Sequence, residues 1–300
     1  PMNGVETWHP EVQVYEIMDA AGQRCGRFYL DLYARPHKRG GAWMDGCLAR
    51  RRIKDTVRLP AAYLVCNFTP PVGDDPALLT HSEVTTLFHE FGHGLHHLLT
   101  TVNELPVAGI HGVEWDAVEL PSQFLENWCW SREALMLLAG HYQSGDPLPE
   151  VLYQRMLAAK HFQAGIFLVR QLELGLFDFR LHHEYDPMQN GQVLEILDAV
   201  RQSVAVIIPP VYNRFPNAFT HIFAGGYAAG YYSYKWAEVL SADAFSAFEE
   251  HGIFDAETGT RFRQNILEVG GSRPALTSFV EFRGRKPQLE PLLRLSGIAA

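Results

Sequence analysis

Apolar residues alternate along the first part of the chain with the period of two that is typical of β-strands. The segment 28–33 reads Phe-Tyr-Leu-Asp-Leu-Tyr, and it follows an apolar segment at 12–17 and a turn at 19–22, so a hairpin is predicted. A third, buried strand is predicted at 61–68, an apolar run bounded by proline-rich loops. We expect residues 1–79 to form a small antiparallel sheet with its connecting loops.

From Thr80 onward the apolar residues recur every three or four positions, which is typical of helices. Thr80 and Glu83 match a capping box, and the apolar positions from Val84 to Leu98 keep helical spacing, so a helix is predicted over 81–99. Further helices, separated by Gly and Pro, are predicted at 117–130, 132–142, 149–183, 191–207, 229–250, 259–268, 274–282 and 287–295. This order predicts an α+β fold, mostly α, with residues 1–300 as a single catalytic domain and its helical region at 80–300.

The composition is that of a globular protein and narrows the range of functions. Of the 300 residues, 47% are hydrophobic, 20% charged and 12% aromatic, which excludes disordered, collagen-like and coiled-coil chains. Lys and Arg number 25 against 34 Asp and Glu, so the net charge is −9, and no dense basic run is present. These features argue against nucleic acid or an anionic membrane as the main partner, and they favour a small molecule, a peptide or a protein.

The cysteines and the apolar runs bear on the cellular compartment of the protein and on whether it crosses a membrane. Cys25, Cys47, Cys66 and Cys129 form no Cys-x-x-Cys pair and are too sparse for a disulfide framework, so we expect reduced thiols and a cytoplasmic protein. All apolar runs fall well short of the roughly 20 residues of a membrane helix, so no membrane span is expected.

The residues with the most chemical information are His89, Glu90 and His93. On a helix, residues four apart lie one turn above another, so both imidazoles share a face and Glu90 lies within reach of a water on a shared metal ion. This is the His-Glu-x-x-His arrangement of zinc peptidases. It lies in a capped helix, and Gly92 and Gly94 leave room for a neighbouring element to approach.

A catalytic zinc ion usually takes three protein ligands and leaves one position for water. The metzincin pattern does not supply the third ligand here, because the positions it requires hold His96 and Leu99. We expect His96 and His97 to be exposed to solvent or to support the ligands, rather than to bind metal themselves.

A glutamate from a following helix is the alternative third ligand, with Glu104, Glu114 and Glu119 as candidates. Spacing favours Glu119, because Asp116 and Glu119 could cap a helix with Pro121 in its first turn. Spacing alone leaves Glu114 open. The outward ring nitrogen of a ligand histidine also needs an acceptor. Three carboxylates are open for that role: Asp116, Glu126 and Glu83.

Five stretches of the chain form a highly specific combination. They are 28–33, 87–97, 115–123, 221–227 (His-Ile-Phe-Ala-Gly-Gly-Tyr) and 231–234 (Tyr-Tyr-Ser-Tyr). Together they resemble the group of zinc metallopeptidases that contains thimet oligopeptidase, dipeptidyl carboxypeptidase and oligopeptidase A, and most closely its bacterial oligopeptidase A type. The resemblance extends over nearly the whole chain and implies a zincin-like catalytic unit.

The resemblance implies that one zinc ion is held by His89, His93 and Glu119, and that Glu90 is the general base. The implied activity is hydrolysis of peptide bonds in short unstructured peptides in the cytoplasm. Members of this group are much longer and have a helical N-terminal region that restricts access, so we expect this chain to be their C-terminal catalytic portion. An intact Glu90 favours an active peptidase, whereas the missing length favours a weakly active or inactive zinc-binding fragment that self-associates through the uncovered surface.

The glycine-rich segment carries the remaining candidate residues. The resemblance implies that Tyr231 and Tyr234 stabilise the transition state, where a phenol hydroxyl can donate to a developing oxyanion. Three positions apart, they could point together from one helix face into a cleft, although aromatic packing would also explain such a pair. His221 is a further catalytic candidate. The candidates for substrate binding are Tyr227, Gly225 and Gly226.

Overall fold

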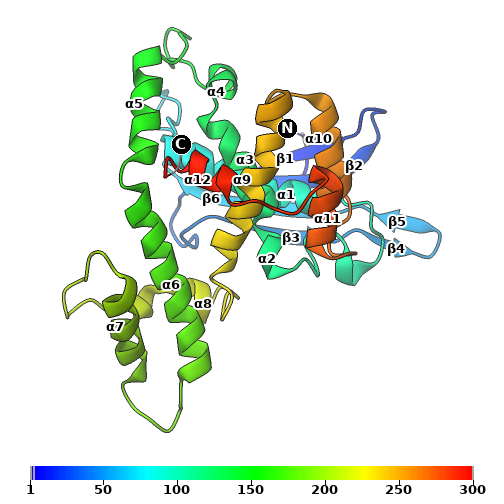
Figure 1. The fold of residues 1–300 in the computed structure, drawn as a ribbon. Coiled ribbons are helices and arrows are strands. Elements are labelled where there is room, and N and C mark those ends of the chain that lie inside the picture. Colours follow the sequence, from blue (N-terminus) through cyan, green and yellow to red (C-terminus); the bar gives the residue numbers. More distant parts are fainter. Residues whose placement is uncertain (1, 3, 299–300) are drawn as a thin grey trace.

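The computed structural model describes residue 2 and residues 4–298, and its strands all precede its helices (Figure 1). One four-stranded sheet has the order β1-β2-β6-β3, and a two-stranded hairpin pairs β4 with β5. The strands are β1 (Gln13–Met18), β2 (Arg24–Tyr33), β3 (Trp43–Leu48), β4 (Arg51–Ile53), β5 (Thr56–Arg58) and β6 (Ala61–Phe68). The predicted hairpin corresponds to β1 and β2, and the predicted buried strand to β6.

The sheet is mixed, so the prediction of a wholly antiparallel sheet is wrong in one pair. β1 runs antiparallel to β2 and β3 antiparallel to β6, but β2 and β6 are parallel neighbours. The chain from 34 to 60 leaves the sheet, adds β3 at the far edge and returns in the direction of β2. β6 is central and buried on both faces, whereas β3 is an edge strand with exposed Asp45 and Gly46. Because Asp45 and Gly46 are adjacent, apolar and polar residues do not alternate in β3, and the sequence predicts no strand there.

The helices, which include two very short ones, follow the sheet. They are α1 (His81–Leu98), α2 (Trp115–Val118), α3 (Leu120–Glu126), α4 (Arg132–Leu138), α5 (Glu150–His161), α6 (Ala164–Glu184), α7 (Gln192–Val204), α8 (Thr220–Phe223), α9 (Ser233–His251), α10 (Ala256–Phe262), α11 (Ala275–Arg283) and α12 (Glu290–Leu295). The expected α+β fold, mostly α, is confirmed. The helix predicted over 149–183 is two helices, because Gln163 adopts a left-handed backbone (φ 56°) that interrupts it. In the described residues, no helix has the length and hydropathy that a membrane span requires.

Helix α1 lies at the centre of the molecule, between the sheet and the other helices. Its capping box is present: the Thr80 hydroxyl accepts the Glu83 N–H at 3.2 Å, and the Glu83 carboxylate accepts the Thr80 N–H at 2.8 Å. Gly94 packs against Leu64 of β6, where an added Cβ would lie 3.0 Å from the leucine side chain. The helix that carries the candidate ligands is therefore fixed at its start and along its buried face.

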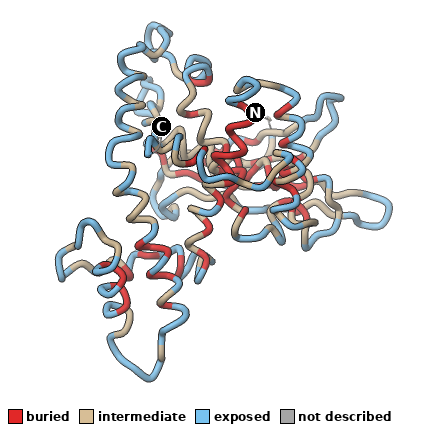
Figure 2. The backbone as a smooth tube through the Cα atoms, viewed as in Figure 1, coloured by how far each residue is buried: buried red, intermediate tan, exposed pale blue. Residues whose placement is uncertain are grey.

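Buried residues form one large core between α3, α9, α10 and α11, a second cluster between α6 and α7, and a small third cluster between the sheet and α1 (Figure 2). The second cluster includes Leu174, Phe177, Leu197 and Phe219, with Tyr227 and Tyr231 packed against it. The α6–α7 pair projects away from the sheet (Figure 1). The glycine-rich segment that follows α8 therefore connects this second cluster to the centre of the molecule.

Candidate metal centre and active site

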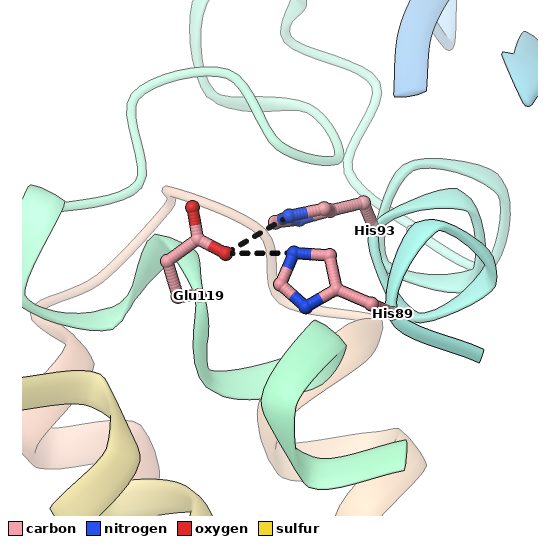
Figure 3. A group of neighbouring side chains, drawn as sticks. All are labelled: His89, His93 and Glu119. Carbon is pink, nitrogen blue, oxygen red and sulfur yellow. Dashed lines mark ion pairs between the residues drawn. The ribbon is translucent and has the colours of Figure 1, made fainter. Parts of the chain in front are cut away.

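Three side chains from two neighbouring parts of the fold converge on one point (Figure 3). His89 and His93 extend from the same face of α1, and their ring centroids are 5.0 Å apart. Glu119, between α2 and α3, places one carboxylate oxygen, Oε2, 3.2 Å from His89 Nε2 and 3.1 Å from His93 Nε2. Their potential ligand atoms all lie within 4.8 Å of one another. The structure thus brings together the two histidines and the glutamate that spacing favoured.

Gly92 explains how Glu119 comes so near to the histidine helix. A Cβ on Gly92 would lie 2.4 Å from the carbonyl oxygen of Pro121 and 2.5 Å from the Cα of Ser122, far inside contact distance. Only glycine therefore permits the backbone of α3 to pack directly on α1. Pro121 lies in the first turn of α3, as predicted, where its missing N–H costs no helix hydrogen bond.

The donor set and its charge suit a zinc ion. Two imidazole nitrogens and one carboxylate oxygen form a ligand set that zinc peptidases use. The His89 Nδ1 atom, which faces away from the cluster, lies 2.6 Å from Glu126 Oε1. This contact identifies Glu126 among the three open carboxylates, since Glu83 caps α1 and Asp116 accepts the Tyr232 hydroxyl.

The protonation preferences of the cluster also favour a bound cation. Burial alone would lower the pKa of His89, but the carboxylates of Glu119 and Glu126 outweigh it and raise that pKa to about 10. Burial would raise the pKa of Glu119, but the adjacent His93 and His89 hold it well below its ordinary value. Glu119 therefore stays ionised, and the point between the three side chains attracts positive charge.

Two further side chains, from Ser122 and Tyr227, donate hydrogen bonds to Glu119. The Ser122 hydroxyl donates to Glu119 Oε2 at 2.9 Å, and the Tyr227 hydroxyl donates to Oε1 at 2.5 Å. Ser122 lies one turn further along, which spacing could have indicated. Tyr227 lies 108 positions away, and no local pattern in one sequence reports such a contact.

A cavity of 980 Å³ opens beside this cluster and is lined by His89, Glu90, His93 and Glu119. Glu90 is only 6% exposed, and burial raises the pKa of its carboxyl group despite the neighbouring histidines. A carboxylate with raised proton affinity beside a metal site suits a general base.

The predicted aromatic residues gather at the same cavity. His221, Tyr227 and Tyr234 line it together with Gly225, and the rings of Tyr227 and Tyr234 stack at 4.9 Å. Tyr231 lines the adjoining cavity of 640 Å³, which shares His221 and Tyr234 with the first. The candidate residues of the glycine-rich segment therefore lie next to the metal cluster.

Two details of the glycine-rich segment differ from expectation. Tyr231 and Tyr234 do not share a helix face, because α9 begins at Ser233 and Tyr231 lies in the turn before it. Their rings are nevertheless in contact, with centroids 5.2 Å apart. Gly226 has φ 88° and faces Trp115, whereas Gly225 lines the cavity.

His96 and His97 are buried, so the expectation that they could be exposed to solvent is wrong. They are 3% and 0% exposed, and burial lowers both pKa values, that of His96 to about 3. His97 Nε2 lies 2.9 Å from the Leu48 carbonyl oxygen, and its ring packs where a Cβ on Gly46 would lie 3.1 Å away. His97 therefore connects α1 to β3 as a neutral side chain, away from the metal cluster.

Replacing Glu126 with Gln is expected to weaken zinc binding by roughly 10- to 100-fold, because the acceptor that orients His89 loses its charge. Equilibrium titration with a chromophoric zinc chelator measures this change. Glu83→Gln is the control, since Glu83 lies on α1, the helix that carries His89, and its carboxylate caps that helix. Equal zinc affinity in the wild type and Glu126→Gln would show that Glu126 does not orient a ligand.

Comparison with known proteins gives the family. Residues 1–298 match the model of peptidase family M3. The chain is 59% identical over 295 residues to oligopeptidase A of Salmonella typhimurium and to oligopeptidase A of Escherichia coli, covering 98% of this chain and 43% of each relative. It thus spans less than half the length of these relatives. A solved structure of PZ peptidase A, 17% identical, has the same fold with a TM-score of 0.58, over 89% of this chain and 43% of that one. The chain therefore belongs to peptidase family M3.

Proposed function

We propose that residues 1–300 form one catalytic unit of a zinc-dependent oligopeptidase that hydrolyses peptide bonds in short unstructured peptides. The observation that carries this proposal is the convergence of His89, His93 and Glu119 at a cavity that Glu90 also lines. The relatives named oligopeptidase A support peptides as the substrate class. The four cysteines are free, which supports the expected cytoplasmic location.

The proposed chemistry assigns a role to each side chain of the cluster. His89, His93 and Glu119 would hold one zinc ion, which when bound supplies positive charge that polarises a peptide carbonyl and lowers the pKa of water. Glu90 would accept a proton from the attacking water at its carboxylate and later donate it to the leaving amine. The raised pKa of Glu90 supports this role, because the group must hold that proton between the two steps.

The aromatic residues would act on the substrate side of the cavity. The hydroxyls of Tyr231 and Tyr234 would donate to the oxyanion that develops on the peptide carbonyl, with His221 beside them. The Tyr227 hydroxyl already donates to Glu119, so we assign it to holding the ligand as well as to contacting substrate. Gly225, which lines the cavity, would leave space for the peptide backbone beside these aromatic residues. Gly226 faces Trp115 and takes no part in this proposal.

Tyr231→Phe and Tyr234→Phe are each expected to lower kcat by roughly 100-fold with little change in KM, because a hydroxyl that acts only in the transition state is lost. Steady-state kinetics on a quenched fluorescent peptide measures both constants. Gln171→Ala is a useful comparison, since Gln171 accepts the Tyr231 hydroxyl at 3.0 Å but would not contact the oxyanion. An unchanged kcat in either Phe variant would assign that tyrosine to aromatic packing.

A second candidate function is a zinc-binding interaction module with little or no catalysis. Residues 1–300 correspond to 43% of the length of the relative from Salmonella typhimurium, so the name of that relative does not by itself assign catalysis to these residues alone. Cleavage of a short peptide by the purified chain, with and without a chelator and with zinc added back, separates the two functions. Chelator-sensitive cleavage supports the peptidase, whereas zinc binding without any cleavage supports the module.

The chain by itself is expected to self-associate and to lack strict selection for short substrates. Three exposed apolar side chains share one face of α6 at helical spacing: Leu172, Leu176 and Phe179. An apolar patch of this kind on a monomer usually finds a partner. Sedimentation velocity at rising concentration should reveal association, and a Leu172→Gln/Leu176→Gln variant should reduce it. A monomer that cleaves short peptides and spares long unfolded ones would contradict both expectations.

A further inference from the structure

Asp178 is a fully buried carboxylate on α6 that has no part in the chemistry described above. Its Oδ1 atom accepts the backbone N–H of Ala229 at 2.9 Å, and its Oδ2 atom accepts the backbone N–H of Tyr231 at 2.9 Å. His182 Nδ1, one turn along the helix, also lies 2.9 Å from Oδ1. One side chain thus accepts hydrogen bonds from two backbone amides, at 229 and 231, that lie more than 50 positions away in the chain. Hydrogen bonds to a charged acceptor are among the stronger ones in proteins.

The segment that Asp178 holds is residues 224–232, here called the tyrosine loop. Its backbone is left-handed at Gly226 (φ 88°) and at Ala229 (φ 51°), and the latter is unfavourable for a residue with a Cβ. Within the loop, the N–H groups of Ala224, Tyr227 and Gly230 donate to backbone carbonyls. The N–H groups of Ala229 and Tyr231 donate to the Asp178 side chain instead, so this carboxylate supports the strained part of the loop.

The tyrosine loop determines where the aromatic side chains that line the two cavities lie. Tyr227 donates from it to Glu119, and Tyr234, just after it, stacks on Tyr227. Tyr231 packs edge-on to His221, with ring centroids 5.8 Å apart. Because Asp178 binds the amides at 229 and 231, it ties the stretch between Tyr227 and Tyr234 to α6.

We infer that Asp178 is a positioning residue, whose carboxylate holds the tyrosine loop so that Tyr227, Tyr231 and Tyr234 stand correctly over the metal cluster. Asp178 would touch neither substrate nor metal. The expected effect of Asp178 on the rate of peptide cleavage rests on the proposed peptidase function. Its hydrogen bonds to the tyrosine loop do not depend on that function. A small misplacement of groups that must meet a transition state can lower a rate by about 100-fold.

Asp178→Asn is the test variant, because it keeps the shape but replaces one of the two acceptor oxygens with an NH2 group that cannot accept an N–H. Hydrogen exchange followed by mass spectrometry should show the tyrosine loop exchanging about tenfold faster or more, since a hydrogen bond to a charged group is lost. The peptide-cleavage assay should show kcat lower by roughly 10- to 100-fold with KM and zinc content unchanged.

Glu173→Gln is the matched control on the same helix. Glu173 is also buried, and its carboxylate bonds to Arg170 on α6 and Arg201 on α7 instead of to the amides of the tyrosine loop. This variant should lose thermal stability while its kcat and the loop exchange stay as in the wild type. A lower kcat in Asp178→Asn that Glu173→Gln does not share therefore reports positioning rather than general destabilisation.

Two results would overturn the inference. The first is rapid hydrogen exchange of the 229 and 231 amides in the wild type. This measurement does not depend on whether a variant folds. The second is faster loop exchange in Asp178→Asn with unchanged kcat. If the wild type cleaves no peptide, the proposed function fails, and the exchange measurement still decides whether Asp178 holds the loop.

Discussion

Replacing Glu90 with Gln should lower kcat by roughly 10²- to 10⁴-fold while the zinc content stays at one per chain. The substitution keeps the shape of the side chain but removes its ability to take a proton from water. Glu90 is not among the three residues whose ligand atoms converge, so no metal ligand is lost. Kinetics on a short fluorescent peptide and elemental analysis of the same sample measure both quantities.

Glu126→Gln provides the contrast for this prediction, because both glutamates lie next to His89 but would serve different purposes. The Glu126 variant should bind zinc more weakly and recover much of its rate in excess zinc. The Glu90 variant should keep its zinc and recover nothing. Loss of zinc from Glu90→Gln, or recovery of its rate by added zinc, would mean that Glu90 supports the metal and is not the base.

Glu119→Ala and His93→Ala should each abolish measurable cleavage, because removing one of three protein ligands leaves a site that cannot retain zinc. We expect less than one zinc per ten chains after dialysis and no cleavage above background, as an order-of-magnitude expectation for a lost ligand. Elemental analysis and the peptide assay test both statements.

Glu114→Gln is the matched control, since spacing alone left Glu114 open as the third ligand. In the structure its carboxylate is near the Ala275 N–H at 3.3 Å, away from the cluster. This variant should bind zinc and cleave peptide as the wild type does. Zinc bound normally by Glu119→Ala but lost from Glu114→Gln would reverse the assignment.

Features encoded in short stretches of sequence could be predicted well. The capping box at Thr80 and Glu83 and the regular apolar spacing gave the bounds of α1 to within a residue. The two histidines four apart placed both imidazoles on one face. The sequence predicts a close approach of a neighbouring element at Gly92, and α3 packs there. Such features depend on neighbours in the chain, which a single sequence displays directly.

Features that depend on packing between distant segments could not be predicted. Three carboxylates were equally placed to orient a ligand histidine, and only the crossing of α3 over α1 selects Glu126. The parallel pairing of β2 with β6 follows from the edge position of β3, whose sequence Trp-Met-Asp-Gly-Cys-Leu lacks the alternation that marks a strand. The sequence left open whether His97 is exposed or supports the ligands, because its partner, the Leu48 carbonyl, belongs to a strand 49 positions away.

The measurement that tests the central claim most directly is an anomalous difference map at the zinc edge, from crystals of the chain grown with zinc. The claim is that His89, His93 and Glu119 bind one zinc ion and that Glu90 does not. We expect a single strong peak about 2.0–2.2 Å from His89 Nε2, His93 Nε2 and a Glu119 carboxylate oxygen. A peak coordinated by Glu114 or His97, or one directly ligated by Glu90, would contradict the claim.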